Sequence, residues 1–437
     1  MEKKGWGVAV AVLAALAVYL LYAFLQPTYT YSLLDPRYDA HQYAKIYAYF
    51  SGFTANYHVS FPFNARILMP WLAAQLPFQD LTADFIWLNG LFIVAAIGLL
   101  TWVWWQLGIR PFWVGIALFW ILFHWKGLVR MYLPDPVTAD AGGYFWLTAL
   151  LAVFLLQEKK GPMSARNWAV ISVITVLGTL QKESFIAVMG VAVVWEGLNV
   201  GLVRTPTRAS GFFAGKNSGG FGMIKPLLFS FCLSLAVYGI VISFFPSGSA
   251  DWRNNSIVSI LRGMKRYVGQ PELFLRVPVS WFLAFGTFWL ALLPTRFLKV
   301  TDSSIYHSSP LTVVTAAPHF YLWLFLSLFG GGDTTRILYN GMPFVLTFLL
   351  LRLNRLPAWT CGYVLVTSLP LMRLFTLEPD LGRYPSAMQQ WCVECWTPAE
   401  SWGYWAYAIA VSAGYYYLSR RFGAVGSDET NEVQAHR

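Results

Sequence analysis

The sequence predicts an all-α protein that crosses a membrane about twelve times. Hydrophobic residues make up 57% of the 437-residue chain and charged residues only 12%, which is about half the charged fraction of a soluble domain. Apolar runs near 20 residues long recur along the chain, and a helix needs about that length to cross a bilayer. Lipid offers the backbone no hydrogen-bond partner, so each crossing segment is expected to be helical.

Charged or Pro/Gly-rich stretches separate the expected spans. The first apolar run follows two lysines, as in a signal peptide, but it exceeds the usual apolar core of about 7–15 residues, and no A-x-A site follows it. We therefore interpret it as an uncleaved span. The predicted spans are 6–25, 84–106, 111–125, 141–157, 167–181, 185–203, 226–245, 277–294, 310–329, 337–352, 357–372 and 402–418.

These spans are expected to form one membrane domain, residues 1–421, with a first outer loop at 26–80. The polar tail at 422–437 is expected to be disordered and cytoplasmic. The net charge of +10 is attributed to basic residues in cytoplasmic loops, which set the orientation, and no nucleic-acid partner is predicted. In this orientation the short basic turns and both termini lie in the cytoplasm, and the unusual charged stretches lie on the outer side of the membrane.

The first outer loop carries the richest of these stretches. Asp35 and Asp39 are four residues apart, and Pro36 favours Asp35 as the cap of an amphipathic helix over 37–52 that lies in the membrane interface. Asp39 is then either part of a solvated face or a carboxylate base just above the bilayer that takes a proton from a hydroxyl. His41 and Tyr43 on the same helix are candidate cavity residues.

Arg66 opens an apolar segment, FNARILMP, later in the same loop. An arginine there can simply extend its charge to the interface along the apolar surface. The alternative is that its guanidinium binds a phosphate by two parallel hydrogen bonds.

Three further charged groups stand at predicted span ends. Asp135 lies in a turn, YLPDP, and Asp140 after it is expected to cap the next helix. Lys182 and Glu183 interrupt an apolar stretch, where adjacent ionisable groups are either an ordinary hairpin turn or functional. Asp333 and Arg336 are three residues apart at the mouth of a span, either as an intramolecular pair or as part of a site.

Cysteine and histidine spacing does not predict a metal site. Cys392 and Cys395 form a single CxxC, which is weak evidence for zinc; in an oxidising compartment a local disulfide is the better interpretation. The histidines show no metal spacing, so neither a metal nor another cofactor is expected.

Three stretches carry a resemblance to a known class. YDAHQY at 38–43, RILMP at 66–70 and GGDTTR at 331–336 resemble motifs of bacterial multi-spanning glycosyltransferases of the GT-C class. Related proteins commonly show YDGQ-x-Y, from which Ala40 and His41 depart.

The resemblance implies an enzyme of the bacterial plasma membrane that moves a sugar from a polyprenyl-phosphate carrier to an acceptor on the outer face. It assigns the base to Asp39, with Asp35 as the alternative, and the donor phosphate to Arg66 and Arg336. By location it places four other residues in the cavity: Asp135, Lys182, Glu183 and Asp333. The implied partners are the lipid-linked donor and membrane lipids.

Two other interpretations remain open. A transporter or flippase for a lipid or sugar predicts ionisable residues near the membrane midplane and interrupted spans. The second interpretation is that the protein is a non-catalytic subunit of a membrane complex. The enzyme interpretation requires Asp39, Arg66 and Arg336 to converge on one cavity.

Overall fold

The computed structural model describes residues 2–29, 39–160, 164–204, 221–248, 256–293, 310–330, 333–374, 377 and 396–435. All regular secondary structure in these ranges is helical, so the predicted all-α class is confirmed. The α-helices are α1 (Glu2–Leu25), α2 (Asp39–Phe50), α3 (Leu68–Ala73), α4 (Leu81–Gln106), α5 (Pro111–Phe123), α6 (Asp140–Lys160), α7 (Ala165–Gln181), α8 (Ser184–Arg204), α9 (Phe221–Phe244), α10 (Ser256–Gly269), α11 (Leu273–Phe285), α12 (Pro310–Phe329), α13 (Thr334–Asn340), α14 (Met342–Leu353), α15 (Trp359–Met372) and α16 (Pro398–Ala435). The 3₁₀ helices are η2 (Phe63–Ala65) and η4 (Gly286–Leu292).

Each predicted span coincides with helical structure, but two of them are broken. The span predicted at 277–294 consists of α11 and η4, which meet at Gly286 with φ of 54°. A Cβ there would approach the Trp120 ring to 2.6 Å, so both the backbone conformation and the packing require glycine. The span predicted at 337–352 consists of α13 and α14, which meet at Gly341 with a bend of 76°.

The number of predicted spans is wrong. Among the described residues, five helical segments are long and apolar enough to cross a membrane, or six if α13 and α14 form one span. The five segments are Gly5–Leu25, Leu81–Gln106, Asp140–Gln157, Met223–Phe244 and Leu273–Leu292. They indicate a multi-pass membrane protein.

Helix length accounts for two of the predicted spans that are not among these segments. The 13 residues of α5 and the 14 of α15 rise only about 20 Å, whereas the hydrocarbon core is about 30 Å thick. The apolar run continues past the end of α5, but His124 adopts an extended backbone with ψ of 134° and stops the helix. At these two helices, hydrophobicity alone predicted crossings that the helix length does not allow.

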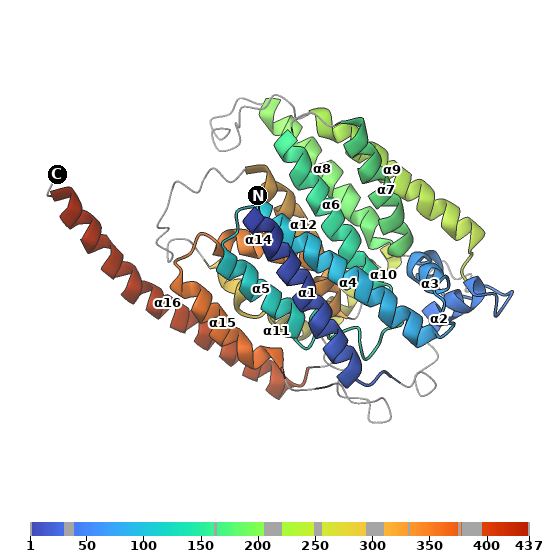
Figure 1. Ribbon diagram of the computed structural model, residues 1–437, viewed down its shortest axis with the longest axis horizontal. Coiled ribbons are helices and arrows are strands. Elements are labelled where there is room, and N and C mark those ends of the chain that lie inside the picture. The colour runs from blue at the N-terminus through green and yellow to red at the C-terminus, as the bar shows by residue number, and fades with distance from the viewer. Residues whose placement is uncertain are drawn as a thin grey trace.

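Helix α14 lies in the core of the bundle, packed against α12, η4, α6 and α5. Eleven of its 12 residues are buried, as expected for a helix that is apolar on all sides. Its Thr347 hydroxyl accepts a hydrogen bond from the Trp104 indole at 2.9 Å and so ties α14 to α4. Elsewhere α4 packs against α1 and α6, and α9 packs against α7 and α8 to form a second group (Figure 1).

The long helix α16 runs along one side of the bundle and projects beyond it (Figure 1). Tyrosine hydroxyls hold it to α15: Tyr363 donates to the Val411 carbonyl, and Tyr407 donates to the Thr367 carbonyl, both at 2.6 Å. The helix continues to Ala435, whereas the sequence predicts a disordered tail from residue 422.

The first loop contains the expected amphipathic helix. It covers 39–50 in the described residues, close to the predicted 37–52, and buries Tyr43, Ile46 and Tyr47 at helical spacing. The Tyr47 hydroxyl donates to the buried Asp84 carboxylate of α4 at 2.7 Å. This packing fixes α2 against α3 and α4. It thereby also fixes the position of Asp39, the first residue of α2.

Candidate functional site

A buried carboxylate, Asp140, lies at the centre of the main charged cluster. Its side chain is completely inaccessible to solvent. The Lys182 ammonium donates to one oxygen at 2.6 Å, and Nε of Arg336 donates to the other at 2.7 Å. Such a charge is tolerated in a low-dielectric interior only when it is paired and hydrogen-bonded, as it is here.

Helix ends bring these three residues together. Asp140 is the first residue of α6, Arg336 lies in the short α13, and Lys182 lies in the two-residue gap between α7 and α8 with an extended backbone. The preceding Gln181 donates its amide to the Ala139 carbonyl. A Cβ at Gly142 would meet that amide at 2.7 Å, so the glycine leaves room for the α7–α8 junction to reach α6.

Two partly exposed carboxylates border the cluster. The Nη1 atom of Arg336 lies 3.4 Å from an oxygen of Asp39 and 3.4 Å from an oxygen of Asp333. The side chains of Asp39 and Asp333 are 37% and 42% exposed. Arg336 therefore joins the buried Asp140 to two carboxylates that solvent or a ligand can reach.

A second ion pair lies beside the first. Arg66 donates to both oxygens of Glu183, at 2.8 Å from Nε and 2.5 Å from Nη2. Its Nη1 donates to the buried Tyr43 hydroxyl at 3.2 Å, and the guanidinium lies 4.9 Å from the centre of the Phe63 ring. Because Glu183 follows Lys182 in the chain, the two ion pairs form one continuous group of charges.

Burial and charge act in opposite directions on these groups. Burial alone would raise the pKa of Glu183, but the Arg66 guanidinium outweighs it and lowers the pKa below its ordinary value. For Lys182, burial lowers the pKa, and the Asp140 carboxylate offsets this only in part. Glu183 is therefore held ionised, while Lys182 is the cation that most readily loses its proton.

Tyrosine hydroxyls extend the network into the core. Tyr132 donates to Asp140 at 3.5 Å, and its oxygen lies 2.8 Å from that of Tyr144. Tyr144 in turn donates to the side-chain oxygen of Asn340 at 3.1 Å. All three residues are buried, and they connect the start of α6 with the end of α13, close to the bend at Gly341.

An apolar groove of about 730 Å³ lies next to the second ion pair, between α8, α9 and α12. Side chains such as Val191, Phe231 and Leu322 line it. Among the described residues that line it, Glu183 is the single charged one. The groove thus adjoins the charged cluster through a residue that belongs to both.

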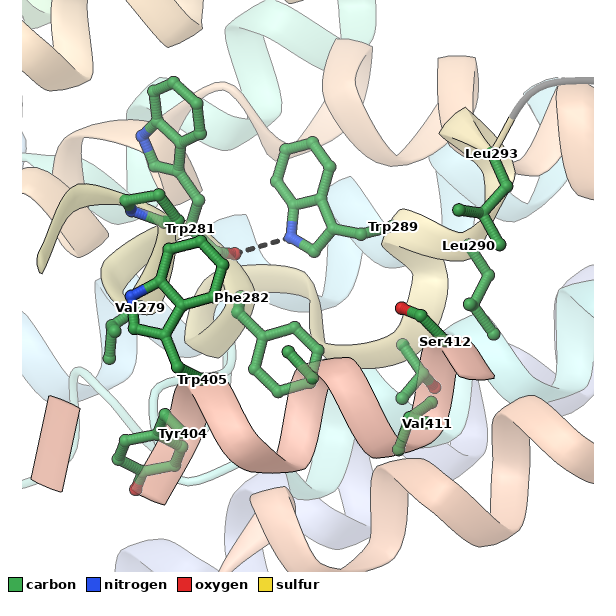
Figure 2. Close-up of a pocket in the computed structure, with 13 residues that line it drawn as sticks. Val279, Trp281, Phe282, Trp289, Leu290, Leu293, Tyr404, Trp405, Val411 and Ser412 are labelled. Atoms are coloured by element: carbon green, nitrogen blue, oxygen red, sulfur yellow. Dashed lines mark hydrogen bonds between the residues drawn. The ribbon is translucent and has the colours of Figure 1, made fainter. Parts of the chain in front are cut away.

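A second cavity, of about 200 Å³, lies between α11, η4 and α16 (Figure 2). Five of the 13 residues that line it are aromatic, with Trp281, Trp289 and Trp405 among them. Trp289 donates its indole hydrogen to the Trp281 carbonyl at 2.6 Å, as Figure 2 shows. None of the described residues that line this cavity is charged, which distinguishes it from the charged cluster.

The structure brings most of the predicted site residues together. Asp39, Asp333, Lys182 and Arg336 surround Asp140 or contact its partners, and Tyr43, Arg66 and Glu183 form the adjoining pair.

Five predicted residues remain, and the structure describes two of them, His41 and Asp135. The Nε2 atom of His41 is buried without a hydrogen-bond partner among the described residues. Asp135 is buried, five residues before Asp140. Asp35, Cys392 and Cys395 lie outside the described residues. In the described part of the chain, no three His, Cys, Asp or Glu side chains are grouped so as to hold a metal ion.

Sequence reasoning missed the central residue. Asp140 was expected only to cap a helix, and it does begin α6, but its carboxylate binds two cations from distant segments. The available signal was the position of an acid at the start of an apolar helix, on the same predicted side of the membrane as Lys182 and Arg336.

Comparison with known protein families, curated proteins and solved structures found no match for the chain.

Proposed function

We propose that the protein is a membrane glycosyltransferase that moves a sugar from a polyprenyl-phosphate carrier to an acceptor on the outer face of a bacterial plasma membrane. The observation that carries the proposal is the position of Asp39. Its carboxylate is partly exposed and lies 3.4 Å from Arg336, at the border of a cation-containing cluster that adjoins an apolar groove. A base, cations and a hydrocarbon site are the three parts that this reaction needs.

In the proposed reaction, Asp39 accepts the proton of the acceptor hydroxyl as that oxygen attacks the anomeric carbon of the sugar. The bond between the anomeric carbon and the phosphate oxygen breaks, and the electron pair leaves with the phosphate. The polyprenyl phosphate thereby gains a negative charge, which fixed cations stabilise. Arg336, Lys182 and Arg66 are the available cations.

The contacts of Arg336 suit this role. Its bond to Asp140 is short, at 2.7 Å, whereas its contacts to Asp39 and Asp333 are 3.4 Å long, which is beyond the usual range for a strong charged hydrogen bond. The short bond orients the guanidinium. The long contacts leave Nη1 able to exchange a carboxylate oxygen for a phosphate oxygen.

The groove supports a donor that carries a hydrocarbon chain. Its apolar walls come from three helices, and Glu183 in its lining is bound to Arg66. Each buried CH₂ group contributes about 0.8 kcal/mol to binding, so a few prenyl units in the groove would supply much of the affinity. The phosphate would then lie at the end of the groove nearest Arg66 and Lys182.

The test is transfer from polyprenyl-phosphate sugars by the full-length protein in nanodiscs, after mass spectrometry of co-purified lipid has identified the donor. Asp39→Asn should abolish transfer and leave donor binding intact. Asp80→Asn is the matched control, because Asp80 is an exposed helix cap and asparagine caps equally well. Asp333→Asn distinguishes the role of the Asp333 carboxylate from that of the Asp39 carboxylate. Full activity of Asp39→Asn would exclude Asp39 as the base.

A transporter or flippase is the second candidate, and one observation favours it. Arg336 lies in α13, the short half of a helix pair bent by 76°, and interrupted helices with buried charges are typical of transporter binding sites. Sealed vesicles distinguish the two candidates: a flippase moves the lipid-linked sugar between leaflets with its sugar–phosphate bond intact.

A further inference from the structure

Helix α10 combines three cations, exposed apolar residues and a packed face within 14 residues. Its 14 residues, SIVSILRGMKRYVG, include Arg262, Lys265 and Arg266 and no acid. The helix would extend about 21 Å, which is too short to cross a bilayer. It ends at Gly269, and the candidate membrane span Leu273–Leu292 begins only four residues later, so α10 is held close to one membrane surface.

One face of α10 is fixed against the bundle. Tyr267 is buried, and its ring packs edge-on against Phe329 of α12, with centroids 5.8 Å apart. A Cβ at Gly263 would meet the Phe329 carbonyl oxygen at 2.9 Å, so the two helices approach closely there. This packing determines which other faces of α10 point away from the protein.

A second face exposes apolar side chains. Leu261 and Val268 are 57% and 84% exposed, and their spacing of seven residues places them on the same side of the helix. Phe274 and Leu275 at the start of α11 are exposed as well. Leu261 and Val268 form an apolar stripe on α10, and Phe274, whose ring packs against Tyr267 with centroids 4.7 Å apart, adds exposed apolar surface at the start of the adjoining span.

The exposed cations Arg262 and Lys265 lie beside this stripe. Their sequence positions put both within about 100° of Leu261 around the helix. Long cationic side chains next to exposed apolar residues can extend from the acyl region to the head groups. Because α10 carries only positive charge, the complementary head group is anionic.

We propose that α10 lies in the plane of the membrane interface and binds anionic phospholipids. Leu261 and Val268 enter the region between head groups and acyl chains, and Arg262 and Lys265 contact the lipid phosphates. This surface would bind anionic lipids whether or not Asp39 takes part in catalysis, so the inference does not rest on the proposed enzymatic function.

The test is titration of the detergent-purified full-length protein with phosphatidylglycerol or phosphatidylcholine, with bound lipid measured by native mass spectrometry. The wild type should retain phosphatidylglycerol preferentially. Arg262→Gln/Lys265→Gln should weaken that binding on the order of tenfold and leave phosphatidylcholine binding unchanged. Arg166→Gln/Arg421→Gln removes the same charge at exposed positions on α7 and α16 and should behave as the wild type. Equal phosphatidylglycerol binding by both double variants would overturn the proposal.

A depth measurement tests the orientation. A nitroxide attached through Val268→Cys, in a background in which Cys232, Cys361, Cys392 and Cys395 are changed to Ser, should be reached by oxygen from the acyl region and protected from an aqueous nickel chelate when the protein is in lipid vesicles. Access by the nickel chelate would overturn the interfacial placement. Spin–spin broadening together with dimers in the mass spectrum would assign the face to a second copy of the chain and would also overturn it.

Discussion

The carboxylate of Asp140 and Nε of Arg336 form a 2.7 Å hydrogen bond between residues 196 positions apart in the chain. It joins the first residue of α6 to the short helix α13. Arg336 also contacts the partly exposed Asp39 and Asp333, so a single buried carboxylate determines where the guanidinium stands relative to both. The pair therefore links the stability of the helix ends to the geometry of the candidate site.

Asp140→Asn is expected to destabilise the protein by about 3–5 kcal/mol, because it leaves Lys182 and Arg336 without the buried charge that compensates them. The midpoint of thermal unfolding in a mild detergent measures the effect. Asp140→Asn/Lys182→Gln should recover part of the loss, since one of the two uncompensated cations is then removed. A double variant no more stable than Asp140→Asn would contradict the pairing.

Arg66 and Glu183 should be energetically coupled. Arg66→Met and Glu183→Gln each leave a largely buried partner unpaired, so the double variant should be more stable than the sum of the two effects predicts, by about 1.5 kcal/mol or more. A double-mutant cycle of unfolding free energies gives the coupling. The pair Arg66→Met and Asp80→Asn is the control and should be additive within about 0.5 kcal/mol.

The Glu183 carboxylate predicts a pH dependence of stability. Arg66 lowers the pKa of Glu183 in the folded protein, so the stabilisation is complete above the unfolded pKa of about 4.3 and is lost as the pH falls through the lower folded pKa. The difference in unfolding midpoint between the wild type and Glu183→Gln should be constant from about pH 7 to 5 and should narrow below about pH 4. A difference that widens on acidification would have the wrong sign.

Gly341→Ala tests the bend between α13 and α14. A Cβ at this position would collide with the indole of the buried Trp323, and overpacking of this kind typically costs about 1–3 kcal/mol. Gly362→Ala is the matched control: Gly362 lies in α15 with no atom within 4 Å of the added Cβ, and the change should stabilise by about 0.5–1 kcal/mol. Equal midpoints for the two variants would show that the bend tolerates a side chain.

Local pattern predicted helix positions well and helix length poorly. The predicted span 84–106 corresponds to α4 at 81–106 and the span 6–25 to α1, because long apolar runs leave the chain few other conformations. The same pattern could not detect the stop at His124 or the bends at Gly286 and Gly341, which depend on packing against residues elsewhere, such as Trp120 and Trp323. The stop at His124 shortens one predicted span, whereas the bends at Gly286 and Gly341 interrupt spans without changing their number.

By itself, the sequence determined an all-α membrane protein with its charge concentrated at helix ends, because burial of apolar runs in lipid is a property of each segment alone. It also identified Asp39, Arg66, Lys182, Glu183, Asp333 and Arg336 as candidates. Only the tertiary structure decided which charges meet, and it made Asp140 the centre. The strength of an ion pair depends on distance and on burial by surrounding helices, and neither quantity is encoded in the local pattern around one residue.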